Sequence, residues 1–98
     1  MQLKPCNDPA AKQLFEVILK LQNIEECFAF FEDLCTAKEI ESLSQRLLVA
    51  KMLQGGSTYL EIDAETGAST AIISRVKRCL YHGNGSYTEM LNRVGRYE

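Results

Sequence analysis

A single glycine, Gly67, separates two short amphipathic segments, and this arrangement restricts the possible fold more than any other feature of the chain. The first segment starts at Thr58, which with Glu61 has the spacing of a capping box at the start of a helix. Glycine adopts positive φ without steric cost, so Gly67 can make a sharp turn. Ser69 is a favourable N-cap for the helix that follows. The pattern therefore predicts a helix-turn-helix over residues 58–81.

Apolar residues at fixed offsets from the turn are expected to lock these two helices at a steep angle. The residues at those offsets are Ile62, Ala68, Ile73 and Val76. The opposite face of the second helix is polar at its start and basic further along: Thr70, Ala71, Ser74, Lys77, Arg78 and Tyr81. Asp63 stands where a small residue would normally pack, so we expect it near the N-terminus of the second helix and not buried without a partner.

The rest of the chain shows no β-type alternation and predicts four further helices, at 8–21, 23–35, 36–54 and 86–93. The third of these is expected to carry an apolar stripe of Ile40, Leu43, Leu47 and Ala50. The sequence thus predicts an all-α fold of about six helices, in which residues 1–98 form a single domain. Its parts are dimerisation helices in 1–54, the helix-turn-helix in 58–81 and a final short helix in 86–93, which supports the recognition helix 69–80.

The first two predicted helices are apolar around too much of their circumference for a monomer of 98 residues. A helix with two apolar sides needs two partners, and a second copy of the chain can supply the second one. We therefore expect a homodimer. The alternative is that these faces close a tight monomeric bundle.

The net charge of −2 by itself argues mildly against a nucleic-acid partner, but the distribution of the charges along the chain weakens that argument. Residues 68–81 carry three cations and no acid: Arg75, Lys77 and Arg78. Residues 23–41 carry six acids against Lys38 alone: Glu25, Glu26, Glu32, Asp33, Glu39 and Glu41. This asymmetry suggests an acidic body with a basic contact face.

Catalytic and metal sites are not expected. His82 lies in a glycine-rich turn without an acid nearby in sequence, and the carboxylates are spread over solvated helix faces. The four cysteines form no C-x-x-C pair and are interpreted as reduced thiols, mostly in the core, with Cys79 on a buried or half-buried side of its helix: Cys6, Cys27, Cys35 and Cys79. A redox switch and a zinc site are the alternatives.

Without an apolar leader or a membrane-length apolar run, the protein is expected in the cytoplasm, away from membranes.

The run RLLVAKMLQGGSTYLEIDAETGASTAIISRVKRCL is similar to the Trp repressor superfamily. Within the superfamily it resembles the Trp-repressor-related YerC/YecD family, whose hallmark resembles T-Y-x-x-I-x-x-x-T-G-A-S-T-A-x-I-S-R-V. The resemblance is clear over residues 41–87 and free of gaps over 58–76. It implies an interlocked dimer that presents two helix-turn-helix units to a palindromic operator in double-stranded DNA.

Together, these features lead us to expect a sequence-specific transcriptional regulator, acting as a repressor, that binds DNA through helix 69–80. The resemblance places recognition residues directly after the glycine turn: Ser69, Thr70, Ala71 and Ser74, with Arg75 one turn on. We also assign to the DNA interface Thr58, Tyr59, Lys77 and Arg78. The alternative is a helical protein-interaction module that keeps the helix-turn-helix as a scaffold and does not bind DNA.

The Trp repressor binds tryptophan against its recognition helix with the help of two arginines. By this resemblance Arg75 matches one of these arginines and Arg46 the other; the alternative is that Arg46 is a solvated helix residue or forms a salt bridge with Glu39 or Glu41. Val76 stands where the repressor has a small glycine, and its branched side chain should crowd an indole. We therefore expect no small-molecule ligand, with tryptophan the least favoured effector and another small effector possible.

Overall fold

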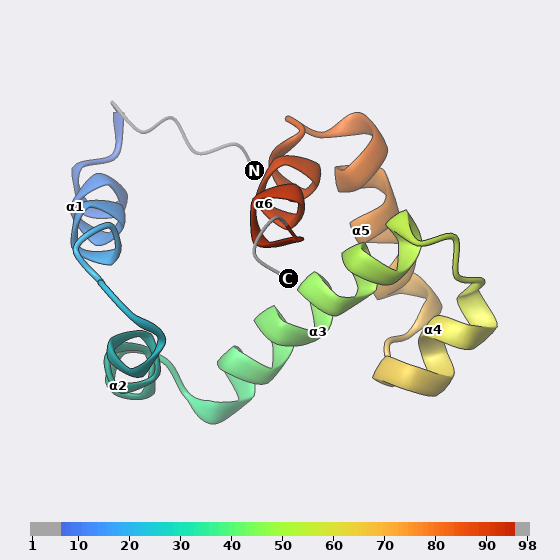
Figure 1. Ribbon diagram of the computed structural model, residues 1–98, viewed down its shortest axis with the longest axis horizontal. Coiled ribbons are helices and arrows are strands. Elements are labelled where there is room, and N and C mark those ends of the chain that lie inside the picture. The colour runs from blue at the N-terminus through green and yellow to red at the C-terminus, as the bar shows by residue number, and fades with distance from the viewer. Residues whose placement is uncertain (1–6, 96–98) are drawn as a thin grey trace. The chain divides into compact units, whose positions relative to one another are not determined.

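The computed structural model describes residues 7–95, and the regular elements in this range are all helices (Figure 1). Its elements are α1 (Pro9–Ile18), α2 (Ile24–Leu34), α3 (Ala37–Gln54), α4 (Tyr59–Thr66), α5 (Thr70–His82) and α6 (Ser86–Gly95). The prediction of a six-helix, all-α fold is confirmed. Within the described range, none of the helices combines the length and the apolar character needed to cross a bilayer. The contacts divide the chain into two compact units on either side of Thr36.

The first unit contains α1 and α2, each of which starts at a side-chain cap. Asp8 accepts a hydrogen bond from the Ala11 N–H at 3.1 Å, and Asn23 accepts one from the Glu26 N–H at 2.8 Å. Helix α1 ends at Ile18, three residues earlier than expected. Its end tightens into bonds between residues three apart, as in the 3.0 Å bond from the Lys20 N–H to the Val17 carbonyl.

No residue between 7 and 36 is buried. Large apolar side chains on and beside α1 and α2 are instead exposed: Phe15, Val17, Leu19, Ile24, Phe28 and Leu34. Leu19 and Phe28 are 82% and 69% exposed. Residues 7–36 therefore have the amphipathic pattern of packed helices but form no buried core among themselves.

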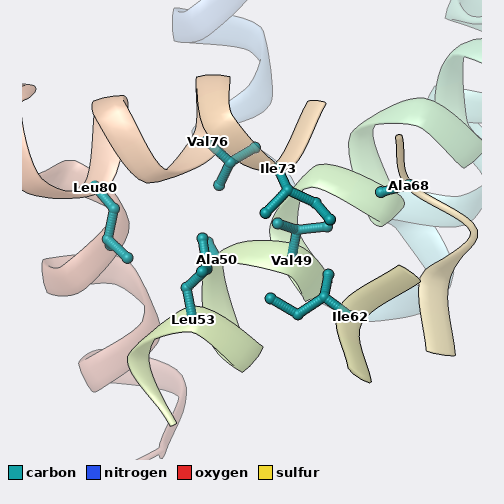
Figure 2. Packing of buried hydrophobic residues seen from close by; sticks show 8 residues of the cluster. All are labelled: Val49, Ala50, Leu53, Ile62, Ala68, Ile73, Val76 and Leu80. Atoms are coloured by element: carbon teal, nitrogen blue, oxygen red, sulfur yellow. The ribbon is translucent and has the colours of Figure 1, made fainter. Parts of the chain in front are cut away.

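The second unit is arranged around α3, which contacts α4, α5 and α6, while α5 in turn contacts α4 and α6 (Figure 1). Its core consists of eight buried apolar residues: Val49, Ala50, Leu53, Ile62, Ala68, Ile73, Val76 and Leu80. Figure 2 shows the side chains of Val49, Ile62 and Ile73 meeting from three different helices. Burial of these side chains, at about 1.5–3 kcal/mol each, fixes the arrangement of α3, α4 and α5.

The apolar stripe that the sequence predicted on α3 is only partly buried within the single chain. Of its four members only Ala50 is buried, whereas Leu43 and Leu47 are 47% and 48% exposed. The reason is that α3 meets the core through its C-terminal half, where Val49 and Leu53 flank Ala50. Beside that face lies an apolar groove of about 440 Å³ between α3 and α6, lined in part by Leu47, Leu48, Leu91 and Val94.

Helix α6 is held to the other helices of the second unit by packing and by a hydrogen bond. Tyr87 and Leu91 pack against the core, as expected for a helix that supports α5. The Gln54 side-chain amide at the end of α3 donates to the Thr88 hydroxyl at 2.9 Å.

Candidate nucleic-acid interface

Helix α4 begins with the reciprocal capping box that the sequence predicted. The Thr58 hydroxyl accepts from the Glu61 N–H at 3.2 Å, and the Glu61 carboxylate accepts from the Thr58 N–H at 2.8 Å. The backbone N–H of Thr58, followed by its hydroxyl, lowers the pKa of Glu61 below its ordinary value of 4.5, because both contacts favour the charged carboxylate. Two hydrogen bonds therefore fix the start of the helix-turn-helix, and they satisfy two backbone N–H groups that water would otherwise have to satisfy.

The turn after α4 is held by both backbone and side-chain hydrogen bonds. Gly67 has φ +70°, as the sequence required, and its N–H donates to the Asp63 carbonyl at 2.8 Å. The Thr66 hydroxyl donates to the Ile62 carbonyl at 2.7 Å and accepts from the Ala68 N–H at 3.1 Å. These contacts define the path of the chain into α5.

A contact that sequence reasoning missed attaches this turn to α3. The Gln45 side-chain amide donates to the Thr66 carbonyl at 2.9 Å. The two residues are 21 positions apart, and no local pattern marks a glutamine on a polar helix face as the partner of a distant carbonyl. Gln45 thus helps to hold the helix-turn-helix against the body of the second unit.

The four locking residues predicted from their offsets are all buried. Ile62 and Ala68 are fully buried, and Ile73 and Val76 are 1% and 2% exposed (Figure 2). Asp63 is exposed, so the carboxylate is not buried without a partner.

Cys79 corrects one expectation, because it is exposed and does not lie on a buried side of α5. The buried stripe of α5 is formed by Ile73, Val76 and Leu80, and Cys79 falls beside it. Cys27 and Cys35 are half-buried free thiols. Cys6 lies outside the described residues.

With its apolar stripe turned into the core, α5 leaves its polar and basic side exposed. The exposed residues are Arg75 and all six that were predicted on this face: Thr70, Ala71, Ser74, Lys77, Arg78 and Tyr81. Thr70, Ser74 and Lys77 are spaced at i, i+4 and i+7, so they lie along one side of the helix. This side combines short polar groups with a cation.

The cations of α5 have no acidic partner in the part of the chain that the structure describes. Over residues 7–95, no carboxylate lies within ion-pair distance of Arg75, Lys77 or Arg78, whereas on α6 Glu89 pairs with Arg93 at 3.3 Å. Helix α5 itself carries no acid. Three cations on one short helix therefore remain available for an anionic partner such as a phosphate backbone.

Two of the assigned residues also act as helix caps. The Thr58 hydroxyl caps α4, and the Ser69 hydroxyl accepts from the Ile72 N–H at 3.2 Å to cap α5. Both side chains are on exposed residues. A hydroxyl that accepts one bond still has a hydrogen to donate, so capping leaves each residue able to bind an acceptor.

Tyr59 is half-buried against the core and also contacts α5. Its hydroxyl lies 3.3 Å from the Ser74 hydroxyl, and the Lys77 ammonium lies 5.6 Å from the centre of its ring. The structure thus brings three of the assigned residues together: Tyr59, Ser74 and Lys77.

The two arginines considered for an effector line the same surface hollow, of about 260 Å³, together with Ser42, Gln45 and Ile72. Arg46 has no ion-pair partner among the described residues. Val76 is directed into the core (Figure 2).

Elsewhere in residues 7–95, no group of three or more histidine, cysteine or acidic side chains is placed to hold a metal ion.

Comparison with known proteins connects this geometry to one family. The family model described as Trp repressor protein matches residues 10–95. The uncharacterized protein YerC of Bacillus subtilis (strain 168) is 55% identical over 98 residues, which are 100% of this chain and 94% of that protein.

Two solved structures share the fold. One is a candidate Trp repressor from Staphylococcus aureus, 56% identical, with a TM-score of 0.91 over 97% of this chain and 95% of that one. The other is a TrpR-like protein from Eubacterium eligens ATCC 27750, 53% identical, with a TM-score of 0.88 over 91% of this chain and 92% of that one.

Proposed function

The chain belongs to the Trp repressor family, and we propose that it is a homodimeric, sequence-specific repressor of transcription that binds a palindromic DNA operator. The family fold is that of a helical, DNA-binding regulator and not of an enzyme. A regulator of this type acts in the cytoplasm, where its operator is.

The observation that carries the proposal is the exposed side of α5. Its short polar groups, Thr70 and Ser74, can approach base edges in a major groove, because neither side chain holds the backbone away from the duplex. Arg75, Lys77 and Arg78 have no carboxylate partner among the described residues and suit phosphate contacts, which fix register and orientation. Ala71 can contact a thymine methyl group from the same helix.

The proposed dimer rests on apolar surface that the single chain leaves uncovered. The first unit has no buried residue in its described part, and the groove between α3 and α6 is lined by leucine and valine side chains. Exposed apolar surface of this kind marks an interaction site. A second copy of the chain would cover these surfaces and place two α5 helices about a two-fold axis, with half-sites about one helical turn apart.

We also propose that DNA binding does not require tryptophan. Arg46 and Arg75 line a common hollow that could accept a small anion. The glycine that opens the tryptophan site in the Trp repressor is replaced by Val76, a larger side chain that is buried in this protein. A small effector other than tryptophan would therefore have to bind beside Ile72, at the arginines.

Selection of bound fragments from random double-stranded DNA by the purified protein tests the proposal. We expect a palindromic consensus with half-site centres about ten base pairs apart. Lys77→Ala should weaken binding to all sequences about equally, whereas Lys38→Ala, a matched loss of an exposed lysine outside α5, should leave binding unchanged. Absence of both a consensus and retention on heparin would instead support a protein-interaction module.

A further inference from the structure

We propose that Tyr59 is a positioning residue that sets the Ser74 hydroxyl and the Lys77 ammonium of α5 for DNA recognition. The inference rests on the proposed function and assigns to Tyr59 a role that acts through its neighbours. Sequence reasoning placed Tyr59 at the DNA interface as a direct contact. In the structure the phenol extends from the first turn of α4 to the middle of α5, where its hydroxyl contacts Ser74 and its ring contacts Lys77.

Tyr59 is held firmly enough to support these two residues. It is the first residue of α4, directly after the Thr58 cap, whose two reciprocal bonds fix the backbone there. Its side chain is half-buried and packs against the same core that fixes α5. Neither Ser74 nor Lys77 has such support of its own, because both are exposed.

The hydroxyl contact restricts what Ser74 can offer to DNA. A serine inside a helix can turn its hydroxyl back to the carbonyl four residues earlier, which here belongs to Thr70. The Tyr59 hydroxyl lies 3.3 Å away, and either oxygen can donate, so it gives the Ser74 hydroxyl a second partner that favours the rotamer directed toward Tyr59. The separation of 3.3 Å exceeds the distance of about 2.7–2.8 Å that is usual between two hydroxyls. We therefore expect the contact to have a modest effect on Ser74 and to shorten when DNA binds.

The ring contact acts on Lys77 in a different way. An ammonium within about 6 Å of a ring centre is attracted by the negative face of the ring. The distance of 5.6 Å meets this condition, and it restricts a side chain with four rotatable bonds to the same side of α5 as Ser74. The two parts of the Tyr59 side chain therefore have different roles. The hydroxyl influences base preference through Ser74, and the ring influences phosphate affinity through Lys77.

Two variants of Tyr59 test this separation on an operator selected with the wild-type protein. Tyr59→Phe keeps the ring and removes the hydroxyl, so it should lower discrimination at the base pair read by Ser74 by about fivefold and leave affinity for non-specific DNA unchanged. Tyr59→Leu removes both and should also weaken binding to non-specific DNA. Tyr87→Phe, which removes the hydroxyl of another half-buried tyrosine packed against the core but lies on α6, should change neither quantity.

A double-mutant cycle excludes a merely structural role. In the Ser74→Ala background, Tyr59→Phe should have no further effect on base discrimination, because the group it positions is gone. An equal effect in both backgrounds, or wild-type discrimination by Tyr59→Phe, would overturn the inference while the proposed function stands. Failure of the wild-type protein to select any consensus would overturn both. Because Tyr59→Phe keeps the packed ring, its result is decisive even if Tyr59→Leu does not fold.

Discussion

Ile62 and Leu60 lie two residues apart on α4, and truncation of each should lower stability by very different amounts. Ile62 is the one buried residue of α4 and is fully buried, whereas Leu60 is 80% exposed. Helix α4 has eight residues, too few to be stable without packing. Its attachment to the core therefore depends on Ile62, and the Leu60 side chain contributes little to it.

The magnitude follows from this burial. Truncation of a buried isoleucine to alanine costs about 2–5 kcal/mol, since transfer free energy is lost and a cavity remains. An exposed side chain changes stability by about 0.5 kcal/mol or less. For a domain of this size, 1 kcal/mol shifts Tm by about 4–8 °C. Ile62→Ala should therefore lower Tm by at least about 8 °C, and Leu60→Ala by no more than about 4 °C.

The measurement is thermal and urea unfolding followed by far-UV circular dichroism, with all proteins at one concentration because dimer formation would contribute to stability. Comparable losses for the two variants would refute the packing of α4 described here. So would a shift of less than about 4 °C for Ile62→Ala.

Three further predictions concern the turn, the cap and the effector. Gly67→Ala should cost about 1–2 kcal/mol in urea unfolding, because φ is +70° there, and Gly67→Asn should cost less; equal costs would contradict this. Glu61→Gln should remove a pH-dependent part of stability. The folded-state pKa of Glu61 is lowered, so its contribution is present above 4.5 and is lost as pH falls through the folded value. Acid titrations of wild type and variant should thus converge at low pH, and a constant separation would contradict the cap. Added tryptophan should leave operator affinity unchanged in fluorescence anisotropy, and tighter binding would show that Val76 does not exclude the indole.

The helix-turn-helix could be predicted from the sequence because its determinants are local. A cap at Thr58, a glycine at 67 and a cap at Ser69 specify two helices and the turn between them. Ile62 and Ile73 are then placed by helical periodicity alone. The exposed side of α5 follows as the complement of its buried stripe.

Features that depend on distant contacts could not be predicted. On α3, Leu47 and Val49 are both apolar and two residues apart, and only the positions of α4 and α5 decide that Val49 is buried and Leu47 half-exposed. The bond from Gln45 to Thr66 and the contact of Tyr59 with Ser74 join residues 21 and 15 positions apart. Periodicity within one helix carries no information on such pairs.

The dependence of operator affinity on salt tests the central claim most directly. If Arg75, Lys77 and Arg78 of two protomers each neutralise one phosphate, six contacts at about −0.9 each give a slope of about −5 for log affinity against log salt concentration. Lys77→Ala should make that slope less steep by about 2, because a dimer loses two contacts. A flat response of the wild-type protein would contradict the assignment of the exposed side of α5 as a DNA-binding surface.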